Sequence, residues 1–492
     1  MDRVPADRGH PTDGDLASEP DLPGEEHVMI GQRAGVLATV AVLAAAWPLV
    51  GAPSATAITP PVVDPLAVPD GTPRPDEPMK HKYDCIATGL IAGTDPAAVP
   101  GSQAFMNLPR LWESAGRGAG VSVALIDTGV WPNPRLPRLR GGGDFIMDGG
   151  DGLQDCDAHG TTVAAIIASS PSESDGLVGV APEVELISIR QSSQMFTPVA
   201  PSATSEEDRR AGTVSSLARA VVAAANTGAR VINMSIVACI PVLKPVDQTT
   251  LGAALRYAAV EKDAVLIAAA GNTSTPGCAQ NPNIDATSVE DPRNWNSVVT
   301  ISTPAWFSDY VLSVSATNNE GQPAVDDQGT DISVGGPWVG VGAPGLFVEG
   351  VNQEGNLING THDAETNSLK PMSGTSFSAA YVSGLAALIR AKYPDLPAHQ
   401  VINRIKQTAH SPAAVVDNRL GYGAIDPVAA LNYDVPPIPT PRENLSRPLG
   451  PPQPEPEPDR RPMMMALVGT ATLAVLLGTV LAVGAMSKSR RG

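Results

Sequence analysis

The chain has 492 residues and a formal net charge of −18, and only 4% of its residues are aromatic. Nucleic acids are bound by basic surfaces, so this acidic balance argues against a nucleic acid partner. The 48 prolines are concentrated around residues 59–78 and 435–462, so the segment between them is the part expected to fold.

The N-terminal segment carries an apolar run at residues 36–50, between Arg33 and the small residues Ala55-Thr56-Ala57. A basic flank, a short apolar core and a small-x-small site are typical of a secretory signal peptide. We therefore expect residues 1–57 to be a leader and signal peptide cleaved after Ala57, with a short membrane anchor as the alternative. The acidic, proline-containing start favours Met29 as the true first residue.

The middle of the chain alternates short apolar runs with segments of helical periodicity. Such alternation predicts an α/β fold with a mainly parallel sheet and helices on both faces. The expected strands are residues 121–126, 184–189, 231–234, 264–270, 298–302 and 311–316, and the expected helices are residues 161–168, 213–226, 249–261 and 381–393.

Three polar or proline-rich segments interrupt this pattern. Residues 191–210 are expected to form a mobile surface loop, and residues 274–296 form a longer loop of the kind that is functional or disordered. The Pro-Glu repeats in residues 435–462 predict a stiff, extended linker.

The C-terminal residues 463–486 carry no charged side chain. This length is sufficient for a transmembrane helix, and residues 487–492 would form a basic cytoplasmic tail. A buried core helix is the alternative, but nothing follows that could cover it. With the signal peptide, this helix predicts a single-pass protein of the cell membrane whose middle part lies outside the cytoplasm.

The chain has four cysteines and no C-x-x-C spacing that would suggest zinc. An even number in an exported chain predicts two disulfides, for which three pairings can be drawn. We expect Cys239–Cys278, which flank one strand–helix–strand unit, and Cys85–Cys156, which would tie the N-terminal segment to the body.

Four polar residues fall at predicted strand ends or helix starts. Asp127 follows a strand in Leu125-Ile126-Asp127-Thr128-Gly129, and Asn272 ends another strand. His159 opens a helix in Asp157-Ala158-His159-Gly160-Thr161, and Ser376 opens the helix after Met372-Ser373-Gly374-Thr375. Each alone suits a turn or an ordinary helix start, but an acid, a base, an amide and a nucleophile together suit covalent catalysis.

The order Asp, His, Ser on an α/β fold is that of subtilisin. The segments around Asp127, His159 and Ser376 resemble the three catalytic boxes of the subtilisin-like serine proteases, over roughly residues 108–433. The resemblance implies that Ser376 is the nucleophile, His159 the general base, Asp127 its orienting acid and Asn272 an oxyanion donor. It implies a serine endopeptidase that acts on proteins or peptides without a metal or other cofactor.

The substrate-pairing strand of the family resembles the segment from Asn233, which makes Ser235, Ile236 and Val237 the expected substrate-binding residues. Glycine is usual at the position of Val237 in subtilisins, so a branched side chain there predicts a narrowed primary pocket. The loop of residues 191–210 is expected near the rim of the cleft.

The overall layout resembles the mycosins, the membrane-anchored subtilases associated with type VII secretion. The resemblance implies an N-terminal extension at residues 58–107 that wraps a peptidase domain at residues 108–434. It also implies partners among the membrane core components of the secretion system, and clipping of a few secreted substrates in a periplasm-like space. A mainly structural role in the secretion complex, and a degradative protease shed from the surface, are the alternatives.

Overall fold

The computed structural model describes residues 58–446, apart from 204, 286 and 364–365, and residues 461–489. The predicted leader, signal peptide and cleavage point at residues 1–57 lie outside the described residues, as do residues 447–460 and the end of the predicted tail.

Seven parallel strands form the central sheet, in the order β12-β11-β9-β7-β3-β5-β4. The prediction of a mainly parallel sheet is therefore confirmed. Strands β4 and β12 escaped prediction because glycines interrupt the apolar run that marks a buried strand. The strands are β3 Ser122–Asp127, β4 Leu139–Asp144, β5 Glu185–Arg190, β7 Val231–Met234, β9 Val265–Ala269, β11 Val311–Thr317 and β12 Val339–Pro344.

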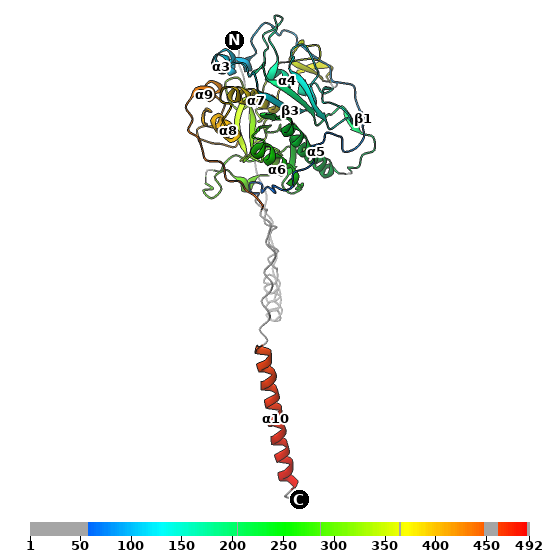
Figure 1. Ribbon diagram of the computed structural model, residues 1–492, viewed down its shortest axis with the longest axis vertical. Helices are drawn as coiled ribbons and strands as arrows, with labels where there is room; N and C mark the ends of the chain where they lie inside the picture. Colours follow the sequence, from blue (N-terminus) through cyan, green and yellow to red (C-terminus); the bar gives the residue numbers. More distant parts are fainter. Residues whose placement is uncertain (1–57, 204, 286, 364–365, 447–460, 490–492) are drawn as a thin grey trace, which may run out of the picture. The chain divides into compact units, whose positions relative to one another are not determined.

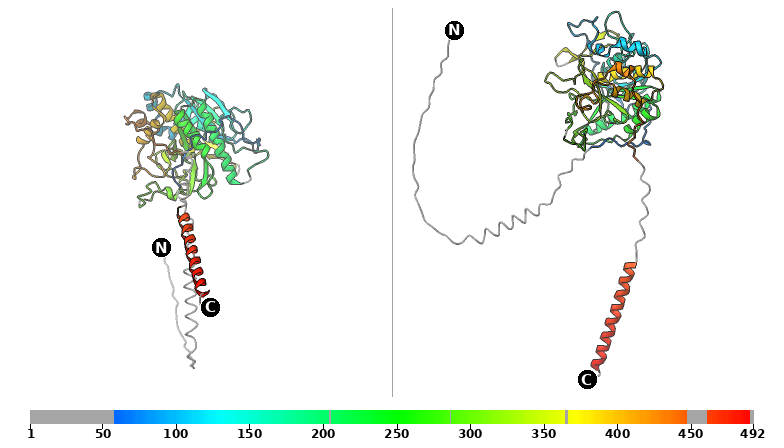
Figure 2. Two further views of the ribbon diagram at one scale, coloured as in Figure 1. Left: turned by 60° about the horizontal axis from the view of Figure 1, so that its bottom comes forward. Right: turned by 90° about the vertical axis from the view of Figure 1, so that its left-hand side faces the viewer.

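Helices cover both faces of this sheet (Figure 1). Successive residues of β3 face opposite sides, so Val123 and Leu125 join the core under one helix layer and Ala124 and Ile126 join the core under the other. The first layer contains α4 (His159–Ala168) and α7 (Thr375–Lys392). The second contains α5 (Glu206–Asn226) and α6 (Thr249–Arg256), drawn in green in Figures 1 and 2.

Shorter elements complete the domain. The remaining helices of the body are α2 Gly101–Met106, α3 Leu108–Ala115, α8 Ala398–Gln407 and α9 Pro427–Asn432, with a π-helical turn Tyr257–Glu261 and a 3-10 turn Trp295–Ser297. The small sheets are β1 (Met79–His81) with β6 (Phe196–Pro198), β8 (Ala238–Pro241) with β10 (Thr300–Thr303), β13 (Gly350–Val351) with β14 (Leu357–Ile358), and β2 (Thr88–Gly89) with β15 (Gly360–Asp363) and β16 (Ser368–Pro371).

Residues 58–107 pack along the domain. Strand β1 pairs with β6, and β2 pairs with β15. The hydroxyl groups of Ser102 and Tyr381 are hydrogen-bonded at 2.5 Å. The structure contains both expected disulfides, Cys85–Cys156 and Cys239–Cys278.

The prediction of a mobile loop at residues 191–210 is wrong for most of that segment. Strand β6 pairs with β1, and α5 begins at Glu206. Ser205 caps this helix, because its side chain accepts from the N–H of Asp208 and the Asp208 carboxylate accepts from the N–H of Ser205. This segment is polar by composition, but it is ordered by its pairing with the distant strand β1 and by the capping box at the start of α5.

The predicted linker of residues 435–462 also requires correction at its start. The N–H of Val63 donates to the carbonyl of Asn444 at 2.8 Å, and the Tyr310 hydroxyl donates to Glu443 at 3.1 Å. Val63 itself is buried at 1% exposure. Residues up to 446 therefore belong to the folded body, and only residues 447–460 separate it from the last helix in the chain.

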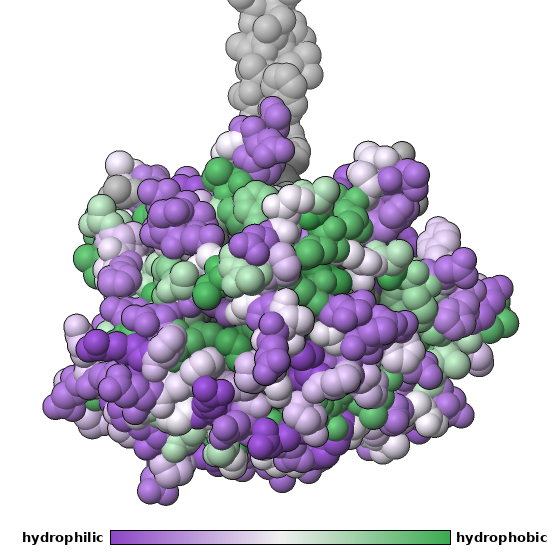
Figure 3. Space-filling model, turned by 90° about the horizontal axis from the view of Figure 1, so that it is seen from above, coloured by the Kyte–Doolittle hydropathy of each residue, from purple (hydrophilic) through white to green (hydrophobic). Residues whose placement is uncertain are grey.

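The last helix, α10 (Arg461–Ser489), includes the apolar stretch Met464–Leu481, which is long and apolar enough to cross a membrane by length and composition. Its apolar side chains are exposed; Leu467 and Val475, for example, are 58% and 68% exposed. By contrast, hydrophilic residues cover most of the face of the body shown in Figure 3.

Candidate active site

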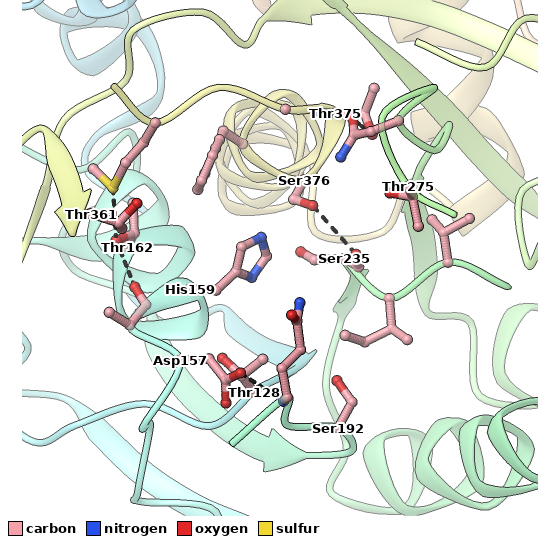
Figure 4. Close-up of a pocket in the computed structure, with 18 of the residues that line it drawn as sticks. Thr128, Asp157, His159, Thr162, Ser192, Ser235, Thr275, Thr361, Thr375 and Ser376 are labelled. Atoms are coloured by element: carbon pink, nitrogen blue, oxygen red, sulfur yellow. Dashed lines mark hydrogen bonds between the residues drawn. The ribbon is translucent and has the colours of Figure 1, made fainter. Parts of the chain in front are cut away.

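The four residues singled out in the sequence come from one edge of the sheet. Asp127 ends β3, Asn272 follows β9, His159 opens α4 and Ser376 is the second residue of α7. Parallel strands place their carboxyl ends at the same edge, so these residues meet around one cleft. The cleft has a volume of about 550 Å³ and is lined by His159, Asn272 and Ser376. Figure 4 shows the side chains of His159 and Ser376 in this cleft.

Asp127 and His159 form a hydrogen-bonded pair. Nδ1 of His159 lies 2.6 Å from Oδ1 of Asp127, which is fully buried. The backbone N–H of Thr128 donates to the same oxygen at 2.7 Å. A carboxylate held in this way accepts from Nδ1–H, which leaves Nε2 as the nitrogen that can take up a proton.

The charges around His159 favour its protonated form. Burial lowers the pKa of His159, but the Asp127 carboxylate, its hydrogen bond, and the nearby Asp155 and Asp157 outweigh that effect and raise the pKa above the ordinary value. A general base must be neutral, and the neutral form of His159 predominates only at pH values above this raised pKa.

Ser376 lies where helix geometry favours a developing anion. As the second residue of α7, it has a backbone N–H without an intrahelical acceptor. Its hydroxyl donates to the carbonyl of Ser235 at 3.4 Å, and Figure 4 shows that the side chain faces the space beside His159. For this hydroxyl to give its proton to His159, it would have to rotate out of this long, weak bond.

Asn272 is oriented by the residue before the serine. Its Oδ1 accepts from both the backbone N–H and the hydroxyl of Thr375, each at 3.0 Å. Because the oxygen is occupied, the side-chain nitrogen is the end of the amide left to donate towards the cleft.

With Asn272 as the oxyanion donor that the family resemblance implies, we expect Asn272→Ala to lower kcat about 10²–10³-fold with little change in KM. Steady-state kinetics on a peptide substrate measure this. Asn432→Ala, at an exposed position outside the cleft, is the matched control. A twofold or smaller loss in Asn272→Ala would contradict the assigned role.

Two carboxylates that precede His159 in the chain also belong to the site, although the sequence pattern did not indicate them. Asp155 is buried and accepts from the hydroxyl groups of Thr128, at 2.8 Å, and Thr161, at 2.7 Å. Burial raises the pKa of Asp155 to about 7. Since Thr128 also contacts Asp127, Asp155 joins the acid of the pair to the start of α4. The sequence did offer one signal for Asp155, because this carboxylate lies only four residues before the histidine that opens α4.

Asp157 lines the cleft and binds two residues of the segment 191–210. Its carboxylate accepts from the Ser193 hydroxyl and from the N–H of Gln194, the latter at 2.7 Å. Ser193 and Gln194 line the cleft, so the first residues of segment 191–210 do lie at the rim, as predicted. Burial raises the pKa of Asp157.

Asp157→Asn should move the acidic limb of the pH profile of kcat/KM to lower pH. Removing this negative charge removes one of the influences that raise the pKa of His159, so the neutral base persists to lower pH. A shift of a few tenths of a unit is expected, because Asp157 is the weakest of the influences that raise this pKa. Asp148→Asn, at an exposed position, should leave the limb unchanged, and an upward shift in Asp157→Asn would contradict this account.

The expected substrate-binding residues Ser235, Ile236 and Val237 all line the cleft. Val237 packs towards Val334 and the Cys239–Cys278 disulfide. A Cβ added at Gly271 would lie 3.3 Å from Val237 Cγ1, so the valine fills space directly beside this glycine. In the described part of the chain, no cluster of three or more His, Cys, Asp or Glu side chains could hold a metal ion.

The chain is similar to known proteins over most of its length. Residues 118–423 match the model of the subtilase family. The chain is 44% identical to Mycosin-3 of Mycobacterium tuberculosis, over 94% of this chain and 99% of the relative. It is 50% identical to the MycP3 protease from the type VII (ESX-3) secretion system, with a TM-score of 0.73 over 77% of this chain and 100% of that chain. A chain in an intact ESX-5 inner membrane complex is 48% identical, with a TM-score of 0.74 over 87% of this chain and 100% of that chain.

This level of identity extends over nearly the full length of the chain, and the sheet and the cleft agree with it. Together they assign the chain to one family. The chain belongs to the subtilase family and, within it, to the mycosins, which are subtilisin-like serine proteases.

Proposed function

We propose that the chain is a membrane-anchored serine endopeptidase that processes substrates of a type VII secretion system and supports that system. The observation that carries the enzymatic part is the 2.6 Å bond between Asp127 and His159 in the cleft that Ser376 also lines. The secretion role is supported by the similarity to chains of ESX-3 and ESX-5 assemblies.

In the proposed reaction, Ser376 Oγ attacks the peptide carbonyl and its proton passes to Nε2 of His159. Asp127 stabilises the imidazolium, while the Asn272 amide and the Ser376 N–H donate to the oxyanion. His159 then gives the proton to the leaving amine, and the C–N bond breaks. A water molecule repeats the sequence on the acyl-enzyme, which releases the acid and restores the Ser376 hydroxyl.

The anchoring rests on the two apolar segments. Residues 1–57 would export the chain, residues 463–486 would span the membrane and residues 487–492 would stay in the cytoplasm. The peptidase domain, residues 108–434, and its extension, residues 58–107, would then face the extracytoplasmic space. The apolar, exposed surface of α10 supports this arrangement. Since residues 435–446 pack on the body, the tether proposed here is residues 447–460.

A strain with Ser376→Ala tests the function directly. If secreted proteins keep their unprocessed termini in this strain while the secretion complex still assembles, the protease and structural roles separate. If the wild type processes none of them either, the proposed processing role is wrong. Similarity to a chain within an assembled inner membrane complex favours the second candidate, a mainly structural role; loss of assembly when the whole protein is deleted, but not in Ser376→Ala, would support it.

The primary pocket offers a prediction on specificity. Val237→Gly should open the space beside Gly271 and raise kcat/KM for a large residue before the scissile bond, relative to alanine, about 10–100-fold. A peptide library varied at that position measures the ratio. Val325→Gly, at a loop position outside the cleft, should leave the ratio unchanged, and an unchanged ratio in Val237→Gly would remove Val237 from the pocket.

A further inference from the structure

Of the N-terminal extension, residues 58–107, Ile86 lines the cleft, and it also packs against Cys156 and Met195. The N–H of Ile86 donates to the carbonyl of Cys156 at 2.8 Å, next to the Cys85–Cys156 disulfide. Cys156 is only three residues before His159, and Ile86 lines the same cleft as His159. The extension is therefore part of the wall of the cleft as well as a cover on the domain.

Backbone hydrogen bonds before and after Ile86 in the chain hold this part of the extension on the domain. On one side, the N–H of Lys82 donates to the carbonyl of Met195 at 2.8 Å, which continues the pairing of β1 with β6. On the other side, the N–H of His362 donates to the carbonyl of Ala87 at 2.8 Å, which continues the pairing of β2 with β15. Because the backbone is fixed on both sides of Ile86, this residue can present a defined surface to a substrate.

The position of Ile86 relative to His159 indicates which half of a substrate it would meet. With the acyl half of the substrate along the expected substrate-binding residues Ser235 and Val237, the leaving half passes His159, which protonates it in the proposed reaction. Figure 4 shows Thr361 on the side of His159 opposite to Ser235. Phe377 also belongs to this region, because its ring centroid lies 5.3 Å from that of His159.

We propose that Ile86 is a specificity-determining residue for the leaving half of the substrate, where it forms an apolar subsite together with Phe377. This inference rests on the proposed function. A second hollow of about 330 Å³ shares Ile86 and Ala158 with the cleft and is bordered by Trp131 and Glu354. The extension thus lies between the catalytic cleft and this second hollow, which could hold the further residues of a longer leaving half.

Internally quenched peptides with four residues after the scissile bond test this inference on the full-length protein in detergent. The first of those residues is varied from alanine to tryptophan. In Ile86→Ala, the ratio of kcat/KM for tryptophan to that for alanine should rise about tenfold, as is usual when an apolar pocket gains the space of a few methylene groups. In Ile86→Phe the same ratio should fall. Ratios for the residue before the scissile bond should not change.

Ile91→Ala is the matched control, because Ile91 belongs to the same extension and packs against Gly360 without lining the cleft. If Ile86→Ala does not fold, Ile86→Val should shift the ratio in the same direction by a smaller factor. Unchanged ratios in all folded Ile86 variants would overturn the inference alone. Absence of any peptide cleavage by the wild type would instead overturn the proposed function, and this inference with it.

Discussion

Replacing Ser376 by alanine is expected to lower kcat about 10⁶-fold while substrate binding is retained. Without the Oγ no acyl-enzyme forms, and only the oxyanion donors and the bound geometry still favour the reaction. The Ser376 hydroxyl makes one long bond, at 3.4 Å to Ser235, so its removal should barely change the thermal midpoint. Single-turnover kinetics with a quenched peptide and a thermal unfolding curve measure both quantities.

Ser373→Ala is the control for this prediction, because Ser373 lies just before α7 and lines the same cleft, and its hydroxyl accepts from the N–H of Phe347. It should retain activity within about tenfold. Cleavage by Ser376→Ala at more than a hundredth of the wild-type rate would show that another group is the nucleophile.

Replacing Asp127 by alanine is expected to lower kcat by about 10⁴-fold. The change removes the acceptor that holds Nδ1–H of His159 at 2.6 Å and the buried charge that stabilises the imidazolium. Asp127→Asn separates these effects, because an amide oxygen placed at Oδ1 can still accept from His159 and from the N–H of Thr128. Its loss should be smaller than that of the alanine variant.

The pH profile gives the second readout for Asp127→Asn. The negative charge of Asp127 raises the pKa of His159, so its removal should lower that pKa and move the acidic limb of kcat/KM to lower pH. A limb that stays in place, or an alanine variant with activity within tenfold of the wild type, would contradict the role of Asp127. Unfolding curves exclude loss of folding as the cause.

The sequence predicted those parts of the site that depend on local signals. Asp127 after an apolar strand, and the helix that has Ser376 near its start, were both readable because strand ends and helix starts leave clear patterns along the chain. The strands β4 and β12 were missed because glycine replaces the side chains that produce such patterns. The framework of the fold therefore followed from the sequence, but the edges of the sheet did not.

The surroundings of the site depend on contacts between distant segments, which composition does not encode. The Asp157 carboxylate orders Ser193 and Gln194, which lie more than 30 residues further along the chain. Ile86 is held at the cleft because β1 pairs with β6 before it and β2 pairs with β15 after it. Likewise, proline content predicts stiffness for residues 435–446, but it does not reveal that their pairing partner is the buried Val63.

A fluorophosphonate reacts with a serine only when that serine is an activated nucleophile, as proposed for Ser376 with His159 and Asp127. Treatment of the full-length protein, followed by peptide mass spectrometry to locate the adduct, should give a single adduct on Ser376. The adduct should form faster as the pH rises through the raised pKa of His159 and should be absent in His159→Ala. Labelling at another serine, or a rate independent of His159 in folded protein, would contradict this role of Ser376.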